Sequence, residues 1–97
     1  MKYKVKFPTS SLAKKFKKKL NSVSSNDLRE QIMQRTLRLE SNPRPSGEPK
    51  IKPPVEVYSY VAQYRLRVGN YRILYDVDDK NKTVWIFALR KRDEKTY

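Results

Sequence analysis

The sequence predicts an α+β domain in which a small, mostly antiparallel sheet is covered on one face by a helical hairpin. Three features support this class: an alternating segment at the start, two adjacent amphipathic helical stretches, and several strand patterns in the second half. The 97 residues suffice for one modest hydrophobic core, so residues 1–97 are expected to form a single domain. The expected order of elements is β-α-α-β-β-β.

The first strand and the first helix follow from the pattern of residues 3–20. Residues 3–7 alternate apolar and lysine side chains, which is typical of a half-buried strand, and Pro8 ends it. Residues 9–11 are Thr-Ser-Ser, and each can cap a helix that runs through position 20. Lysines cover the outer side of this helix, where they are either solvated or in contact with phosphates or an acidic partner. The expected buried stripe consists of Leu12, Phe16 and Leu20.

A second helix is expected from the cap residues 24–26 to about Ser41. Asp27 and Glu30 lie in its first turn, where the helix dipole favours acidic side chains. The short link to the preceding helix indicates an antiparallel helical hairpin. The side chains expected to be buried are Leu28, Ile32, Met33, Leu37 and Leu39.

The stretch from Asn42 to Pro54 is expected to be irregular, because it holds five of the six prolines and one of the two glycines. It is either an ordered surface crossing or a mobile flap. Arg44, Lys50 and Lys52 give this stretch a positive charge. These side chains are candidates for gripping a substrate, against the alternative that the stretch is only a linker.

Two further strands are expected in the second half of the chain, one at residues 55–62 and one at residues 83–89. The segment from Val55 to Ala62 is β-branched and aromatic and should pair beside the central hairpin. Residues 83–89 are apolar on both faces, which suits a central strand, and residues 78–82 form the turn before it. Strict alternation places Val84, Ile86 and Ala88 on one face and Trp85, Phe87 and Leu89 on the other.

The central hairpin spans residues 64–77 and turns at Gly69-Asn70, a pair suited to a two-residue loop. Such a loop fixes the register, so Arg67 should face Arg72, and directly opposed residues share a face of the sheet. One face is a core face that carries Tyr64, Leu66, Val68, Tyr71, Ile73 and Tyr75. The other face carries Arg65, Arg67 and Arg72.

The three arginines of this hairpin require an explanation, because like charges directly opposite each other destabilise a sheet. They are either solvated side chains tolerated at an edge or parts of an anion site. Guanidinium groups match phosphate geometry and stay charged at all accessible pH values. We favour a phosphate site, since the opposite face of the same hairpin is so well defined as core.

The charge balance points to an anionic partner. The chain has 23 Lys plus Arg against 10 Asp plus Glu, a formal net charge of +13. Such a surplus suits nucleic acid, the ribosome, an anionic membrane or an acidic protein. The absence of Cys and His excludes disulfides, the common zinc sites and the usual general base at neutral pH. No apolar run has the length of a membrane span or signal peptide, so a cytoplasmic location is expected.

Two segments identify a family. The central segment, residues 64–75, reads Tyr-Arg-Leu-Arg-Val-Gly-Asn-Tyr-Arg-Ile-Leu-Tyr, and residues 90–92 read Arg-Lys-Arg. With the basic composition and the predicted order of elements, they resemble the RelE/ParE superfamily of bacterial and archaeal toxins. RelE-type members are ribosome-dependent mRNA interferases that cut the message in the ribosomal A site. ParE-type members share the fold but poison DNA gyrase.

The resemblance implies roles for particular residues. Arg72 matches the family's arginine just after the hairpin turn, and Arg65 and Arg67 match the basic pair on the preceding strand. Some RelE-type enzymes carry lysines at that pair.

Further roles fall near the C-terminus. The family's terminal basic residue falls on Lys91 or Arg92, of which we prefer Arg92, and Arg90 is expected to bind substrate beside it. Tyr97 would correspond to a C-terminal tyrosine that some RelE-type enzymes use in stacking or proton transfer.

The implied activity is a metal-independent endoribonuclease without a cofactor, in which the RNA 2′-hydroxyl attacks the neighbouring phosphate. Arginine is a poor proton acceptor, so the general base is left open among Lys91, Tyr97 and a ribosomal group. The implied partners are mRNA, the 30S A site and an acidic RelB-type antitoxin, and no membrane. The alternatives are a gyrase poison or a non-catalytic RNA- or protein-binding module of the same fold.

Overall fold

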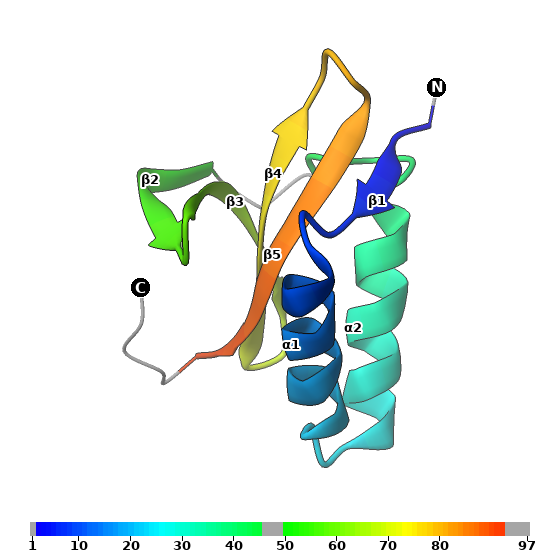
Figure 1. Cartoon of the computed structure of the whole chain (residues 1–97). Coiled ribbons are helices and arrows are strands. Elements are labelled where there is room, and N and C mark those ends of the chain that lie inside the picture. The colour runs from blue at the N-terminus through cyan, green and yellow to red at the C-terminus, as the bar shows by residue number, and fades with distance from the viewer. Residues whose placement is uncertain (1, 46–49, 93–97) are drawn as a thin grey trace.

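The computed structural model describes residues 2–45 and 50–92, which form two helices and a five-stranded sheet (Figure 1). The elements are β1 (Lys4–Lys6), α1 (Ser10–Asn21), α2 (Asn26–Arg38), β2 (Lys50–Val57), β3 (Tyr60–Val68), β4 (Tyr71–Asp78) and β5 (Thr83–Lys91). The strand order across the sheet is β1-β5-β4-β3-β2, with β1 parallel to β5 and the other neighbours antiparallel. The predicted α+β class is confirmed, and the sheet has one strand more than the expected order β-α-α-β-β-β contains.

Both helices begin where the sequence indicated. The Thr9 hydroxyl accepts a hydrogen bond from the Leu12 backbone N–H at 3.1 Å, and the Ser25 hydroxyl accepts one from the Leu28 N–H at 3.2 Å. These bonds satisfy backbone donors that a helix start leaves open. The predicted buried stripe of α1 is confirmed. Neither described helix is long and apolar enough to cross a membrane.

The buried face of α2 differs from the expectation in two residues. Met33 and Leu37 are 48% and 58% exposed, although both were expected in the core. The face toward the sheet follows the spacing of Ile32, Thr36 and Leu39, all buried. Thr36 is tolerated there because its hydroxyl donates to the Ile32 carbonyl at 2.6 Å. Met33 and Leu37 are each one position further round the helix, which carries them out of the core.

The proline-rich stretch is more regular than expected. Strand β2 begins at Lys50 and includes Pro53 and Pro54, so the prediction of irregular structure through residue 54 was wrong. An edge strand tolerates proline because one side of it needs no ladder hydrogen bonds. The register with β3 shifts between Lys50 and Val55.

The prediction of a single strand from Val55 to Ala62 was also wrong. The chain reverses at Tyr58-Ser59, so the segment supplies the end of β2 and the start of β3. The reversal moves the boundary between two strands, and β3 runs on without interruption into the first strand of the central hairpin.

A bulge in β5 overturns the expected faces of that strand. Leu74 pairs with Ala88 and Tyr75 pairs with Ile86, so Phe87 is an extra residue on β5. The extra residue shifts the alternation that follows it. Leu89 therefore joins Val84 and Ile86 on one side, and Ala88 joins Trp85 and Phe87 on the other.

The central hairpin has the predicted register. Arg67 pairs with Arg72, Leu66 with Ile73 and Tyr64 with Tyr75. Gly69 has φ +59°, a conformation that side chains rarely adopt, and a β-carbon there would lie 2.8 Å from Leu28 Cδ1 in α2. Glycine at this position therefore serves both the turn and the close approach of the helix.

The sheet has an apolar cluster on each side. The larger cluster lies under α1 and α2 and includes the predicted core face of the hairpin, with Leu66, Ile73 and Tyr75 almost fully buried. On the other side, β2 and β3 curl away from the helices (Figure 1) and enclose a smaller cluster. Its buried members are Ile51, Val57, Ala62, Leu74, Phe87 and Ala88.

Replacing Gly69 tests the turn. Gly69→Ala should lower the free energy of unfolding by about 1–2 kcal/mol, because a positive φ costs an alanine about that much. The measurement is urea unfolding followed by circular dichroism. In a Leu28→Ala background the same substitution should cost less, since the contact with the helix is gone. An equal cost in both backgrounds would contradict the steric part of this account.

Candidate functional site

Three arginines form a row across the strands β3, β4 and β5, near the β3–β4 turn. Arg67 of β3 is opposite Arg72 of β4, and Arg72 is opposite Arg90 of β5. Neighbouring strands are about 4.8 Å apart, and directly opposed residues share a face. The row therefore concentrates positive charge on the side of the sheet away from the helices.

Arg92 extends this basic row at the end of β5. Its backbone N–H donates to the Asn70 carbonyl at 2.7 Å, and its own carbonyl accepts a hydrogen bond from Arg72 Nη1 at 3.3 Å. These two bonds fix the end of β5 against the hairpin turn.

A small pocket lies between these elements. It has a volume of about 100 Å³ and is lined by Arg67, Gly69, Asn70, Tyr71, Arg72 and Arg92. At about 30 Å³ per water molecule, this is room for about three waters or a small anion. No acidic side chain lines it among the described residues. We call it the arginine pocket.

The fold does not need this concentration of charge. Opposed arginines cost stability, and the packing of Val68 and Tyr71 on the other face would be served equally by polar residues outside. Guanidinium groups converging on one pocket can hold a multiply charged oxyanion through several charge-assisted hydrogen bonds. The arrangement is thus suited to binding phosphate.

Arg65 lies on the predicted face but in a different hollow. It is opposite the buried Leu74, one step further from the turn than Arg67. It lines a cavity of about 480 Å³ with β2 residues that include Lys52 and Glu56. Arg67 and Arg72 thus line one pocket together, whereas Arg65 lines a separate cavity.

The other predicted site residues are dispersed. Lys91 is opposite Tyr71, on the helix side of the sheet, and is not among the residues that line the arginine pocket. Lys50 and Lys52 are exposed on the edge strand β2. Tyr97 lies outside the described residues.

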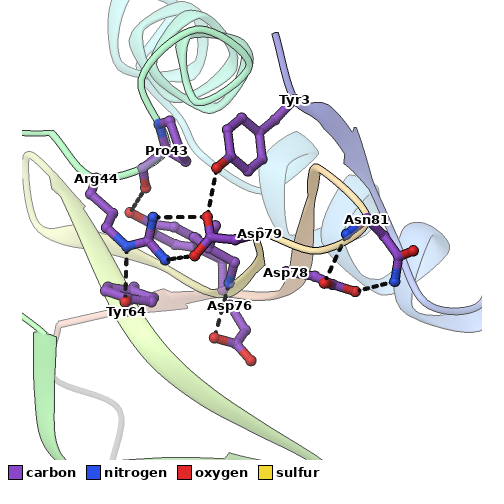
Figure 2. Close-up of polar contacts among 10 residues, drawn as sticks. Tyr3, Pro43, Arg44, Tyr64, Asp76, Asp78, Asp79 and Asn81 are labelled. Atoms are coloured by element: carbon purple, nitrogen blue, oxygen red, sulfur yellow. Dashed lines mark hydrogen bonds and ion pairs between the residues drawn. The ribbon is translucent and has the colours of Figure 1, made fainter. Parts of the chain in front are cut away.

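Arg44 lies in a polar cluster at the far end of the sheet (Figure 2). Its Nη1 and Nη2 donate to the two carboxylate oxygens of Asp79 at 3.2 and 2.9 Å, and its Nε donates to the Tyr64 hydroxyl at 3.0 Å. The Tyr3 hydroxyl donates to the same carboxylate at 2.5 Å. The structure therefore uses the Arg44 guanidinium to join the segment after α2 to the β4–β5 turn, and does not bring it to the arginine pocket.

This cluster shifts the ionisation of its members. The hydrogen bond from Arg44, followed by that from Tyr3, lowers the pKa of Asp79 from 3.8 to about 2. The bond to Asp79 raises the pKa of Tyr3. Nearby Asp76 behaves oppositely, because burial raises its pKa.

Sequence reasoning missed one feature of the arginine pocket and one polar cluster outside it. The contribution of Asn70 is a backbone carbonyl, which residue type does not reveal. The cluster around Asp79 joins residues 35 and 76 positions apart, and nothing in the local pattern links them. Among the described residues, no group of three or more acidic side chains is arranged to hold a metal ion.

Comparisons with solved structures place the fold among the RelE toxins. The chain is similar to a chain of the archaeal RelE-RelB complex from Pyrococcus horikoshii OT3, with 26% identity, a TM-score of 0.70, and coverage of 97% of this chain and 99% of that one. It is also similar to a chain of the toxin-antitoxin complex RelBE2 from Mycobacterium tuberculosis, with 20% identity, a TM-score of 0.65, and coverage of 95% and 100%.

A third similar structure is a mutant of the E. coli toxin RelE in the free state, with 22% identity, a TM-score of 0.61, and coverage of 96% and 86%. A sequence comparison with curated proteins found no match.

The family model described as the ParE toxin of type II toxin-antitoxin system, parDE, matches residues 9–96. The chain therefore belongs to this family of toxins, within the RelE/ParE superfamily.

The Asp79 cluster predicts a defined acid response. Because the folded pKa of Asp79 is below 3.8, its carboxylate stabilises the fold above about pH 4, and this contribution is lost as the pH falls toward 2. Asp79→Asn should lower the unfolding temperature at about pH 6. The difference between the unfolding temperatures at about pH 6 and about pH 2.5 should therefore become smaller. The effect will be modest, because the group is exposed.

Asp76→Asn is the matched control, since it removes one carboxylate from the same region. Burial raises the pKa of Asp76, so its charged form destabilises the fold at about pH 6 and contributes nothing at about pH 2.5. This substitution should widen the difference in unfolding temperature. A change of the same sign in both variants would contradict the two assignments.

Proposed function

We propose that this toxin is a ribosome-dependent endoribonuclease that cleaves translated mRNA in the ribosomal A site. The observation that carries the proposal is the arginine pocket, in which Arg67, Arg72 and Arg92 converge from three segments. The similarity over 97% of this chain to a chain of a RelE-RelB complex supports the same activity class.

The chemistry proposed is attack of a 2′-hydroxyl on the adjacent phosphate, with departure of the 5′-oxygen. The products are a 2′,3′-cyclic phosphate and a 5′-hydroxyl. Negative charge grows on the non-bridging oxygens in the transition state, and cations already in position stabilise it most effectively. We assign this role to Arg72 and Arg92, with Arg67 and Arg65 binding the flanking strand.

Proton transfer requires a further group. Arginine accepts protons poorly, and the Tyr71 ring packs in the core under the helices. Lys91 is on the helix side of β5. We propose Tyr97 or a ribosomal group, rather than Lys91, as the acceptor of the 2′-hydroxyl proton, and the departing 5′-oxygen takes up a proton as it leaves. Orientation of the message by the ribosome would supply a large part of the rate through positioning alone.

We also propose that an acidic antitoxin of the RelB type neutralises the toxin. Two of the similar structures are described as toxin–antitoxin complexes. A groove of about 460 Å³ between the helices and β1 has a mainly apolar lining that includes Phe7, Met33 and Leu37. Exposed apolar side chains in such a groove are suited to an apolar partner segment, and acidic residues would complement the net charge of +13.

A gyrase poison is the second candidate, and one observation favours it. The family model that matches residues 9–96 is that of the ParE toxin. A poison of that type acts by binding and needs no nuclease site, so the arginine pocket would then contact DNA or protein.

Substitution of Arg72 separates these functions. Arg72→Ala should reduce message cleavage in a purified translation system by about 100-fold or more, because a transition-state cation is lost. Cleavage by Arg72→Lys should lie between that of the unmodified toxin and that of Arg72→Ala, since lysine keeps the charge but lacks the planar guanidinium group. Cleavage sites are read by primer extension on the message.

Arg38→Ala is the control, because it removes the same side-chain type from an exposed position at the end of α2. It should cleave like the unmodified toxin. DNA damage with intact mRNA would instead establish the gyrase alternative. Inhibition of translation without cuts in either nucleic acid would indicate a binding module.

The groove between the helices gives a separate prediction. Met33→Gln together with Leu37→Gln should weaken antitoxin binding by about tenfold or more, since two apolar contacts are lost. The free energy of unfolding should change little, because both side chains are about half exposed. The measurement is calorimetric titration with the small acidic protein encoded beside the toxin. Gln31→Ala, on the same helix, is the control. If the double variant binds the antitoxin as tightly as the unmodified toxin does, the groove is not the docking site.

A further inference from the structure

A second basic hollow lies beside β5 and shares no lining residue with the arginine pocket. It has a volume of about 160 Å³ and lies where α1, the β2–β3 turn and β5 meet. Cations reach it from two elements: Lys15 and Lys19 from α1, and Arg90 from β5. Phe16, Phe87 and Leu89 supply an apolar floor, and no carboxylate lines it among the described residues.

Tyr58 positions two of these cations. The residue is 53% exposed although it is a large aromatic one, and its φ of +57° is one that tyrosine rarely adopts. Lys15 Nζ lies 4.7 Å from the ring centroid and Arg90 Cζ lies 5.6 Å from it. Both distances are within the range of cation–π attraction. The ring thus gathers an ammonium and a guanidinium that would otherwise repel each other.

Arg90 lines this hollow and also belongs to the row of arginines that includes Arg72. This residue is opposite Arg72, so the two backbones are one strand spacing, about 4.8 Å, apart. The row of Arg67, Arg72 and Arg90 therefore leads from the arginine pocket toward Lys15 and Lys19. A single strand laid along this row would pass from the arginine pocket to the second hollow.

We propose that this hollow binds a second backbone phosphate of the RNA strand whose scissile phosphate occupies the arginine pocket. The inference rests on the proposed function and specifies where the strand leaves the reaction site. A guanidinium with two ammonium groups suits an anion that offers several oxygens, as a phosphate does. Tyr58 acts as a positioning residue, because it holds Lys15 and Arg90 in place.

The test uses two matched pairs of substitutions in α1. Lys15→Gln with Lys19→Gln removes the two lysines of the hollow, and Lys14→Gln with Lys18→Gln removes two from the neighbouring stripe of the same helix. Each pair changes the net charge from +13 to +11 (13 − 2). Each pair also removes one lysine from the last helical turn, Lys19 or Lys18, so the loss of favourable dipole interactions is matched.

The probe is a fluorescent single-stranded RNA with 2′-O-methyl groups throughout, which binds but cannot be cleaved. Affinity is measured over a range of salt concentrations, because each phosphate neutralised adds about 0.7 to the slope of log K against log salt for single strands. The slope for the Lys15/Lys19 variant should be smaller in magnitude than that of the unmodified toxin by about 0.7, and the slope for the Lys14/Lys18 variant should be unchanged. Equal slopes for the two pairs, or no binding by the unmodified toxin, would overturn the proposal.

Tyr58 variants test the positioning role. Tyr58→Phe keeps the ring and should keep the slope, whereas Tyr58→Leu should lose as much as the Lys15/Lys19 pair. Unfolding temperatures establish that each variant is folded. Loss of antitoxin binding by the Lys15/Lys19 pair with an unchanged RNA slope would overturn the proposal in favour of a protein partner.

The probe keeps this test separate from the proposed nuclease activity. If Arg72→Ala abolishes cleavage and the two lysine pairs bind RNA alike, only the second phosphate site fails. If the unmodified toxin cuts no message but the Lys15/Lys19 pair loses slope, the nuclease proposal fails, and the hollow is an RNA-binding site without a reaction beside it.

Discussion

The hairpin turn at Gly69 is the constraint on which the rest of the site depends. A two-residue loop permits one register, and a slip of one residue would exchange the core and solvent faces of both strands. The register puts Leu66, Val68 and Tyr71 under the helices, and so obliges Arg67 and Arg72 to face each other on the other side. Leu28 packs against the turn, which couples the helical layer to the position of the arginines.

The second constraint is that the sheet is apolar on both sides but not along its whole length. The smaller cluster around Leu74 and Phe87 covers the outer side toward the middle of the strands and stops before Arg72 and Arg90. Charged groups therefore lie at the border of an apolar surface, where water competes less with an anion than on an open face. The repulsion between opposed arginines is offset by the burial of the same strands on the helix side.

Local patterns made much of this fold predictable. The helix starts at Thr9 and Ser25 and the register of the central hairpin depend on neighbouring residues alone, and all three were found as expected. The features that were missed depend on distant contacts. Strand β2 forms through prolines because it lies at an edge, and Met33 is exposed because the stripe of α2 that packs into the core runs through Ile32 and Thr36. The Asp79 cluster joins segments that only the finished fold brings together.

The extra residue at Phe87 determines which terminal cation shares a side with Arg72. Alternation without it would turn Lys91 outward and carry Arg90 and Arg92 beneath the helices; with it, the two arginines face outward and the lysine does not. One extra residue thus reverses the face of the sheet to which each later side chain of the strand points. In this chain, the outward-facing residues of the last strand are found by counting back from Arg92, whose N–H is bonded to the hairpin turn, because strict alternation counted forward from Thr83 turns Lys91 outward instead.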